Sequence, residues 1–374
     1  MRIDRGATAT AGRRVRAGIA IGLFALALAG CSAFGPGTVE RDRIDYSSAL
    51  SESFKEQTLL NIVRLRYADM PTFMDVSSVI GGYSFGTQVS PSALFNLAPP
   101  HNPVSLPGAV GSVTGTAAFA DRPTISYTPL TGDKFTKSLL TPIPPSAIFS
   151  LISAGYPADL ILQVTVRALN GVYNRSDAGG GGRPADPAFY PLLDALRRLQ
   201  LSDSVSLRVE KRGPDSVGLV VISGERSPEA QRDSDFVRKT LNLTPDAKEL
   251  TLTYGAVQRS DVELAVLSRS MIEILREIAA GIEVPADKVA QGRTFANPEI
   301  GPDADPRDRP YIRIHSGPTP PADAYAAVRY RDAWYWIDSR DLATKRIFTF
   351  LLIFFSLAET GVVPQAPVLT VPVP

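Results

Sequence analysis

Cysteine and histidine are nearly absent from this chain of 374 residues, which has one cysteine, Cys31, and two histidines, His101 and His315. A single cysteine cannot form an intramolecular disulfide, and it excludes dithiol redox motifs and zinc sites built from several cysteines. Two histidines exclude a metal site made mainly of imidazole ligands. The hydrophobic core must therefore stabilise the fold without covalent or metal cross-links, and no cofactor is predicted.

An excess of charge of one sign is also missing, because 39 basic residues are balanced by 38 acidic ones. Residues 1–30 hold five arginines and one aspartate, so the rest of the chain has 34 basic and 37 acidic residues and no basic block. This balance disfavours nucleic-acid binding. Long apolar runs are missing too: residues 17–28 and 347–357 fall short of the roughly 20 residues that a membrane-spanning helix needs.

A short N-terminal motif is the most specific signal that the chain does contain. Arg13, Arg14 and Arg16 precede the apolar stretch 17–28, which leads into Leu28-Ala29-Gly30-Cys31. A basic segment followed by a short apolar one is typical of a targeting signal and is not part of the fold. With its terminal cysteine, this segment resembles the processing signal of bacterial lipoproteins.

The resemblance to the lipoprotein class implies cleavage between Gly30 and Cys31 and attachment of diacylglycerol to the Cys31 thiol. In that class an aspartate after the cysteine retains the protein at the inner membrane, whereas this chain has Ser32. The resemblance therefore implies a lipid anchor on the periplasmic face of the outer membrane of a Gram-negative bacterium. Two or more acyl chains anchor a protein more stably than one. The alternative is an ordinary cleaved signal followed by a chance cysteine.

The composition divides the chain into five segments. They are the signal peptide (1–30), a flexible tether (31–40), an N-terminal helix with a long β-hairpin and a helical pair (41–175), a C-terminal α+β domain (183–360) and a Pro-rich extended tail (361–374). The Gly-rich stretch 179–182 lacks the Lys-Ser/Thr of a phosphate-binding loop, so we interpret it as a linker.

The first half of the chain has the pattern of one helix and one long hairpin. Apolar residues at intervals of three and four predict a helix over 46–66, which ends before Pro71 because the residue preceding a proline disfavours helical geometry. Strands are predicted over 73–89 and 119–127, and 110–118 extends the second one backwards. The Pro-rich excursion between them is a long loop, and such loops are usually functional or disordered.

The rest of the chain mixes helices and strands without a regular βαβ repeat. Helices are predicted over 144–155, 157–170, 187–199, 227–241, 260–280 and 338–357, and strands over 204–210, 217–223, 249–254, 311–315, 326–330 and 333–337. Ser260-Asp261-Val262-Glu263 matches a capping box, and the last three strands have the spacing of a meander. These elements predict an α+β fold of mixed, mainly antiparallel sheets packed with helices, with a long buried apolar helix near the C-terminus.

Two motifs resemble sites with known chemistry. Gly82-Tyr83-Ser84-Phe85-Gly86 matches the nucleophile elbow of serine hydrolases, but the residues that follow cannot open the helix that this elbow requires, so a strand is favoured. The stretch 303–308 begins like a calcium-binding loop, yet Asp308 stands where glycine is needed and Ile314 where glutamate is needed. A solvated acidic loop is therefore favoured, and no metal site is predicted.

The aromatic segment near the C-terminus allows two interpretations. Trp334, Tyr335 and Trp336 lie on one predicted strand, with Arg329 and Arg331 on the preceding strand and turn. Exposed Trp, Tyr and Arg side chains are typical of partner-binding surfaces. Because alternate strand residues share a face, the two tryptophans can instead pack on the 347–357 helix. This second interpretation is favoured, since that helix needs a sheet to cover it.

The sequence as a whole favours a non-enzymatic outer-membrane lipoprotein, a binding or scaffold component that contacts another envelope protein through the Pro-rich excursion, the tail or the aromatic hairpin. One alternative is an oligomeric pore or secretion component that inserts the 73–127 hairpin, whose strands have a membrane-spanning length. The many Ala, Gly, Ser and Thr residues of the second strand argue against it. A serine hydrolase using Ser84 is the last alternative, and homo-oligomerisation is left open.

Overall fold

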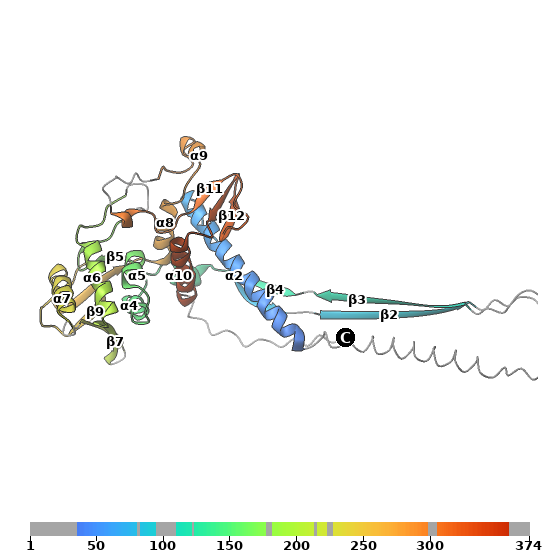
Figure 1. Ribbon diagram of the computed structural model, residues 1–374, viewed down its shortest axis with the longest axis horizontal. Helices are drawn as coiled ribbons and strands as arrows, with labels where there is room; N and C mark the ends of the chain where they lie inside the picture. Colours follow the sequence, from blue (N-terminus) through green and yellow to red (C-terminus); the bar gives the residue numbers. More distant parts are fainter. Residues whose placement is uncertain are drawn as a thin grey trace, which may run out of the picture. The chain divides into compact units, whose positions relative to one another are not determined.

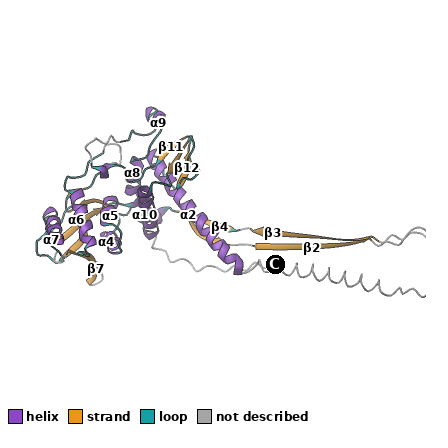
Figure 2. Ribbon diagram, in the orientation of Figure 1, coloured by secondary structure: helices purple, strands orange, loops and turns teal. Residues whose placement is uncertain are grey.

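The computed structural model of the chain describes residues 36–80, 83–94, 110–121, 123–176, 182–212, 215–222, 227–297 and 305–358. The predicted signal peptide with Gly30 and Cys31, most of the Pro-rich excursion, most of the Gly-rich linker and the Pro-rich tail lie outside the described residues. The chain divides into two compact units, residues 1–71 with 138–374 and residues 72–137. Helices occur together with mixed and antiparallel sheets, so the α+β prediction is confirmed (Figures 1 and 2).

The smaller unit contains the predicted hairpin as two consecutive strand pairs. Strands β1 (Met74–Ile80) and β4 (Thr124–Pro129) pair antiparallel, as do β2 (Tyr83–Leu94) and β3 (Val110–Asp121). Figure 2 shows β2 and β3 as a long two-stranded ribbon. The second strand thus reaches back to Val110, as predicted, and the first continues past the predicted end to Leu94. The short helix α3 (Gly132–Phe135) and one π-helical turn (Thr136–Leu140) follow.

The larger unit begins with helix α2 (Pro36–Arg66), which starts inside the predicted tether and ends before Pro71, as predicted. A six-stranded sheet follows with strand order β6-β5-β10-β9-β8-β7. Its strands are β5 (Val166–Leu169), β6 (Val172–Tyr173), β7 (Val205–Arg212), β8 (Asp215–Ile222), β9 (Glu249–Tyr254) and β10 (Glu263–Ser268). Helices α4 (Pro145–Ser153), α5 (Ala158–Thr165) and α6 (Phe189–Leu201) contact this sheet, and α7 (Pro228–Thr240) packs on α6 (Figure 1).

The predicted helix over 157–170 is wrong from Val166 onwards, because the chain leaves α5 at Thr165 and continues as β5. Asn170 and Gly171 both have positive φ and form the two-residue turn between β5 and β6. Asn-Gly is the strongest signal for such a hairpin turn, so it marks a strand reversal here and not a helix end. The Asn170 amide also donates to the Leu241 and Glu263 carbonyls at 2.9 and 3.1 Å, which ties β5 to β10.

The predicted helix over 260–280 is also wrong at its start. Residues Glu263–Ser268 form β10, which pairs antiparallel with β5 and parallel with β9. Helix α8 (Met271–Ala280) begins only afterwards, and Ser270 forms its capping box: the Ser270 hydroxyl accepts from the Glu273 amide, and the Glu273 carboxylate accepts from the Ser270 amide. A short apolar run fits a buried strand or a helix equally well, and pairing on both sides selects the strand.

The C-terminal strands form a separate three-stranded sheet. Strands β11 (His315–Gly317), β12 (Ala326–Tyr330) and β13 (Ala333–Ile337) have the order β11-β13-β12. The predicted meander is therefore wrong, since the first strand pairs with the third. Arg331, with φ +55°, and Asp332 form the tight turn between β12 and β13, as predicted. The short helix α9 (Ala286–Ala290) and a 3₁₀ turn (Pro306–Asp308) lie between α8 and this sheet in the chain.

Helix α10 (Leu342–Ala358) follows the small sheet and carries the apolar run. Phe348, Phe350, Leu351, Phe354 and Phe355 are buried, whereas Ile353 is 39% exposed. The described side chains of α10 thus include both buried and exposed residues, and the predicted long buried helix is not shown. Among the residues that the structure describes, no helix is both long enough and apolar enough to cross a membrane.

Candidate binding site at the end of helix α2

Helix α2 ends in a tight reversal that places its last residues beside α8 and the small sheet. Ala68 takes a positive φ of 57°, the Ala68 amide donates to the Leu65 carbonyl, and the Asp69 amide donates to the Arg64 carbonyl at 2.9 Å. This pair of bonds is a Schellman motif, in which glycine normally takes the left-handed position. The reversal positions Arg66, Tyr67 and Asp69 around one pocket.

Arg66 is a buried cation, with only 2% of its surface exposed. Its guanidinium donates to the Ala280 carbonyl at 2.7 Å and to the Phe295 carbonyl at 2.9 Å, and it stacks 4.0 Å from the centre of the Phe295 ring. Among the described residues no carboxylate forms an ion pair with it. Burial lowers the pKa of Arg66 to about 10, so the side chain remains charged at neutral pH. Its positive charge is therefore not neutralised by an acidic partner in the described part of the chain.

Five side chains, two from the reversal that follows α2 and three from the β12–β13 hairpin, form a polar cluster next to Arg66. The Tyr67 and Tyr335 hydroxyls lie 2.6 Å apart, and the Tyr330 hydroxyl donates to the Asp69 carboxylate. Arg331 forms an ion pair with Asp69 at 2.9 Å. Burial and the hydrogen bond with Tyr67 raise the pKa of Tyr335, so its phenol stays protonated at neutral pH. The cluster joins the end of α2 to the turn of the aromatic hairpin.

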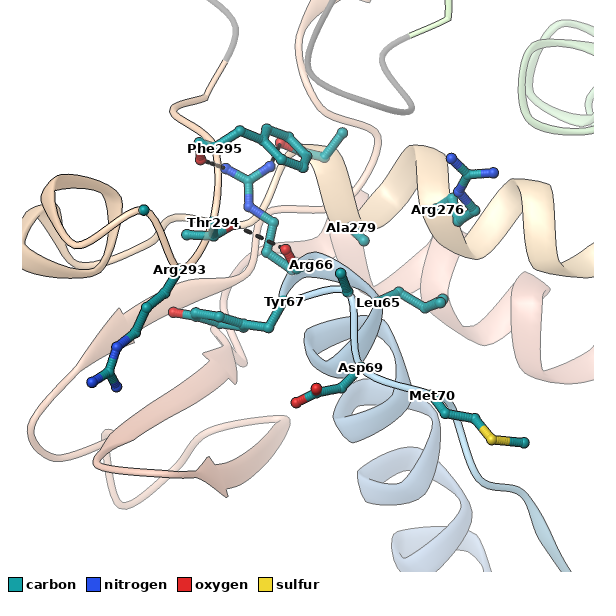
Figure 3. A pocket seen from close by; sticks show the side chains of 13 residues that line it. Leu65, Arg66, Tyr67, Asp69, Met70, Arg276, Ala279, Arg293, Thr294 and Phe295 are labelled. Atoms are coloured by element: carbon teal, nitrogen blue, oxygen red, sulfur yellow. Dashed lines mark hydrogen bonds between the residues drawn. The ribbon is translucent and has the colours of Figure 1, made fainter.

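An open pocket of about 760 Å³ lies beside this cluster. It is lined by 65–70 at the end of α2, by Arg276, Ala279 and Ala280 of α8, and by the segment 292–295. Arg276 and Arg293 are exposed, and no residue that the structure describes forms an ion pair with either. Figure 3 shows these two arginines on opposite sides of the pocket with Arg66 between them. The carboxylate of Asp69 is already engaged by Arg331, so the lining carries excess positive charge.

The predicted site residues divide between two faces of the aromatic hairpin. Tyr335 is 1% exposed and, with Arg331, belongs to the polar cluster. Trp334 and Trp336 are half-buried on the opposite face of β13, where Trp334 pairs with the exposed Arg329 and Trp336 with Ala327. The favoured interpretation, with the tryptophans turned towards the core, is therefore wrong. Both faces of this strand are aromatic, so alternation alone cannot select the inner one.

The remaining sequence motifs take structural positions. Ser84 lies within β2, paired with Ala120, and the strand continues past it, so the strand–helix elbow of a hydrolase is not formed there. The His315 ring contacts Glu283 at 2.9 Å and lies beside Trp336. Asp305 forms an ion pair with Arg307 at 2.8 Å. Within the described ranges, no group of three or more His, Cys, Asp or Glu residues could hold a metal ion.

Sequence reasoning missed Arg66, Tyr67, Asp69, Arg276 and Arg293, although it located the helix end that carries the first three. The available signal was the Arg-Tyr-Ala-Asp stretch directly before Met70-Pro71, where a helix end must leave polar groups accessible. Comparison of the chain with protein-family models, with curated proteins and with solved structures gives no match. The geometry of the pocket and the N-terminal motif are therefore the features of the chain that bear on its function.

Proposed function

We propose that this chain is a lipid-anchored lipoprotein of the outer membrane that faces the periplasm and acts as a non-enzymatic binding or scaffold component of an envelope assembly. The lipoprotein-like motif ending at Cys31 supports the location and the anchor. The observation that carries the binding role is the open pocket with Arg276 and Arg293 exposed and in no ion pair with a described residue, although Asp332 interacts electrostatically with Arg293. Exposed cations in a pocket that form no ion pair are suited to bind an anionic group of a partner.

The chemistry of the pocket supports binding over catalysis. Guanidinium groups stay protonated and cannot act as general bases. Because the pKa of Tyr335 is raised, its phenol stays protonated at neutral pH and cannot act as a general base. The Asp69 carboxylate accepts from Tyr330 and pairs with Arg331, so it is not poised to abstract a proton. What the pocket offers is positive charge and hydrogen-bond donors held by a rigid helix end.

The proposed partner is an envelope protein that presents a carboxylate-rich segment to this pocket. Arginines present planar donor pairs that match carboxylate geometry, and interfaces are enriched in Arg and Tyr. The aromatic hairpin lies directly beside the pocket, because Tyr330 and Arg331 belong to the turn that contacts Asp69. The Pro-rich excursion and the tail remain further proposed contact segments. A second copy of the chain is the alternative partner at these sites.

Two alternative functions concern the hairpin of the smaller unit. An oligomeric pore or secretion component that inserts the 73–127 hairpin is the second candidate function, and the unbroken pairing of β2 with β3 favours it. A serine hydrolase has less support because Ser84 lies inside a strand.

We also propose that the exposed Ile353 side of α10 is covered in the assembly, which would make α10 the long buried helix that the sequence predicts.

Charge reversal at the pocket tests the binding role. Arg276→Glu combined with Arg293→Glu should weaken crosslinked recovery of the main envelope partner about ten-fold, because two attractions become repulsions. Lys239→Glu with Arg346→Glu is the matched control, since both side chains are exposed and lie on helices away from the pocket lining. Equal recovery with the pocket variant and the control variant would rule out the pocket as the contact site.

The anchor is tested separately. Radiolabelled palmitate should enter the wild-type chain and should not enter Cys31→Ser. Ser32→Asp should move the protein from the outer-membrane to the inner-membrane fraction. Palmitate incorporation by the Cys31→Ser variant would contradict the proposed lipidation site.

A further inference from the structure

The hairpin of the smaller unit has two chemically different faces. Residues that oppose each other in an antiparallel pair share a face, and the register pairs Tyr83 with Asp121 through Leu94 with Val110 without a break. One face of the β2–β3 ribbon therefore holds Tyr83, Phe85, Val89, Pro91, Ala93, Val113, Ala117 and Phe119, with Thr87, Gly111, Gly115 and Asp121. The other face holds four serines, two threonines and Gln88 together with small or aliphatic residues.

The β1–β4 pair repeats the same division. Its register places Val76 opposite Tyr127 and Val79 opposite Ile125, so most of the apolar residues gather on one face. Ile80, which pairs with Thr124 and is 45% exposed, is the apolar exception on the other face. The apolar face is open: Met74 is 44% exposed, Ile125 is 39% exposed and Tyr127 is 56% exposed. Apolar faces of this extent on a soluble protein usually mark a contact surface. A two-stranded ribbon is also marginally stable by itself in water, so its apolar face requires a cover.

We propose that this apolar face docks into the interface of a lipid bilayer, with the ribbon lying along the membrane and its polar face towards water. The chemistry of the strands favours lipid over a protein partner. The four strands contain no lysine or arginine and only two carboxylates, Asp75 and Asp121, whereas a protein interface has a polar rim. A face that is almost without charge fits the boundary between head groups and acyl chains.

The ribbon edges determine how it meets the membrane. Each described sheet in this unit has two strands, so every strand has an edge with unpaired backbone groups. Such edges are too costly in the hydrocarbon core, but at the interface they can bond to water and head groups. The ribbon is therefore predicted to lie flat, as amphipathic helices do at a membrane surface. The proposed lipid anchor would keep it near a bilayer, but the docking chemistry belongs to the ribbon itself.

The single cysteine makes this proposal directly testable. In full-length Cys31→Ser protein, which lacks both the lipid and the native thiol, one new cysteine at a time carries an environment-sensitive fluorophore. Val89→Cys and Tyr127→Cys place it on the apolar face, and their neighbours Gln88→Cys and Thr128→Cys place it on the polar face. Phosphatidylcholine vesicles contain a lipid-bound quencher near the top of the acyl chains. The apolar segment 17–28 can hold the chain on a vesicle by itself, so vesicle binding alone is not informative. The readout is therefore the difference in quenching between apolar-face and polar-face probes.

If the apolar face docks, vesicles should shift the fluorescence emission of the two apolar-face probes to shorter wavelengths. The lipid-bound quencher should also quench these two probes at least twice as strongly as their polar-face neighbours. Equal quenching on the two faces would overturn the proposal. Apolar-face probes that are already shielded without vesicles, together with a larger species on gel filtration, would assign the face to a second copy of the chain. Stronger quenching by a deep quencher than by the shallow one would indicate insertion across the bilayer and reject the flat arrangement. None of these outcomes depends on lipidation of Cys31 or on the arginine pocket.

Discussion

The hydrogen bond between Tyr67 and Tyr335 allows a quantitative test of how the end of α2 is held. The two hydroxyls are 2.6 Å apart, and the residues are 7% and 1% exposed. Tyr335→Phe or Tyr67→Phe removes one hydroxyl and leaves the other buried without this partner. An unsatisfied buried hydroxyl costs about 1–3 kcal/mol, so each single variant should lose about that much stability. The ring contacts are kept, because phenylalanine fills nearly the same volume.

The double variant distinguishes a true hydrogen-bond pair from two unrelated contacts. Replacing both partners by apolar groups of the same shape is nearly neutral, because neither hydroxyl is then left unsatisfied. The combined loss should therefore fall short of the sum of the single losses by about 2 kcal/mol or more. Additive losses would show that the two hydroxyls do not stabilise each other.

The assay can follow this region directly. The chain has two tryptophans, Trp334 and Trp336, and they flank Tyr335 on β13, so fluorescence during urea unfolding reports the hairpin that carries the bond. The midpoint and the slope should both be measured, because a changed slope signals a departure from two-state unfolding. Tyr254→Phe is the control: this tyrosine is 54% exposed and should change stability by less than about 0.5 kcal/mol.

Three further predictions concern helix ends and pH. Ser270→Ala should cost about 1 kcal/mol through loss of the capping box of α8, whereas Ser260→Ala should stay within about 0.5 kcal/mol; the reverse order would contradict the observed helix start. Ala68→Gly should stabilise the protein by roughly 0.5–1 kcal/mol in thermal unfolding because φ is +57°, and a loss would mean that the alanine methyl group makes compensating contacts. Burial, with hydrogen bonds to Tyr67 and Asp308 respectively, raises the pKa of Tyr335 and Tyr190. Above about pH 10 the unfolded chain loses phenolic protons that the folded chain keeps, so stability should fall as pH rises, and less steeply in Tyr335→Phe; an unchanged slope would place this phenol in water.

The two capping-box motifs show that a short sequence window does not always predict where a helix begins. Ser260 and Ser270 are each followed three residues later by glutamate, so both match the same motif. The hydrophobic stripe after Ser260 also has helical spacing. Residues Glu263–Ser268 nevertheless form β10, because β5 and β9 pair with them on both sides and bury their apolar side chains. Backbone pairing with β5, which lies nearly a hundred residues away, is not encoded in a local window.

The arginine pocket illustrates the same limit for function. The helix end at Arg66 follows from Pro71, and the turn at Arg331-Asp332 follows from the strand spacing. Neither pattern indicates that Arg331 meets Asp69, or that Arg66 reaches the end of α8. These partners are separated by more than two hundred residues, so their contact depends on how α2, α8 and the small sheet pack together.

The sequence by itself determined the α+β composition, the end of α2, the β12–β13 turn and the long hairpin, because helix stops, tight turns and strand alternation are set by residues within a few positions of one another. It also carries the lipoprotein-like motif, which is read from contiguous residues and awaits its chemical test. Tertiary structure alone decided that residues 263–268 are a strand, that Tyr335 and not the tryptophans faces inwards, and that arginines from α2, α8 and the 292–295 segment meet in one pocket. The physical reason is that burial and charge pairing depend on distant partners, and only the folded chain brings those partners together.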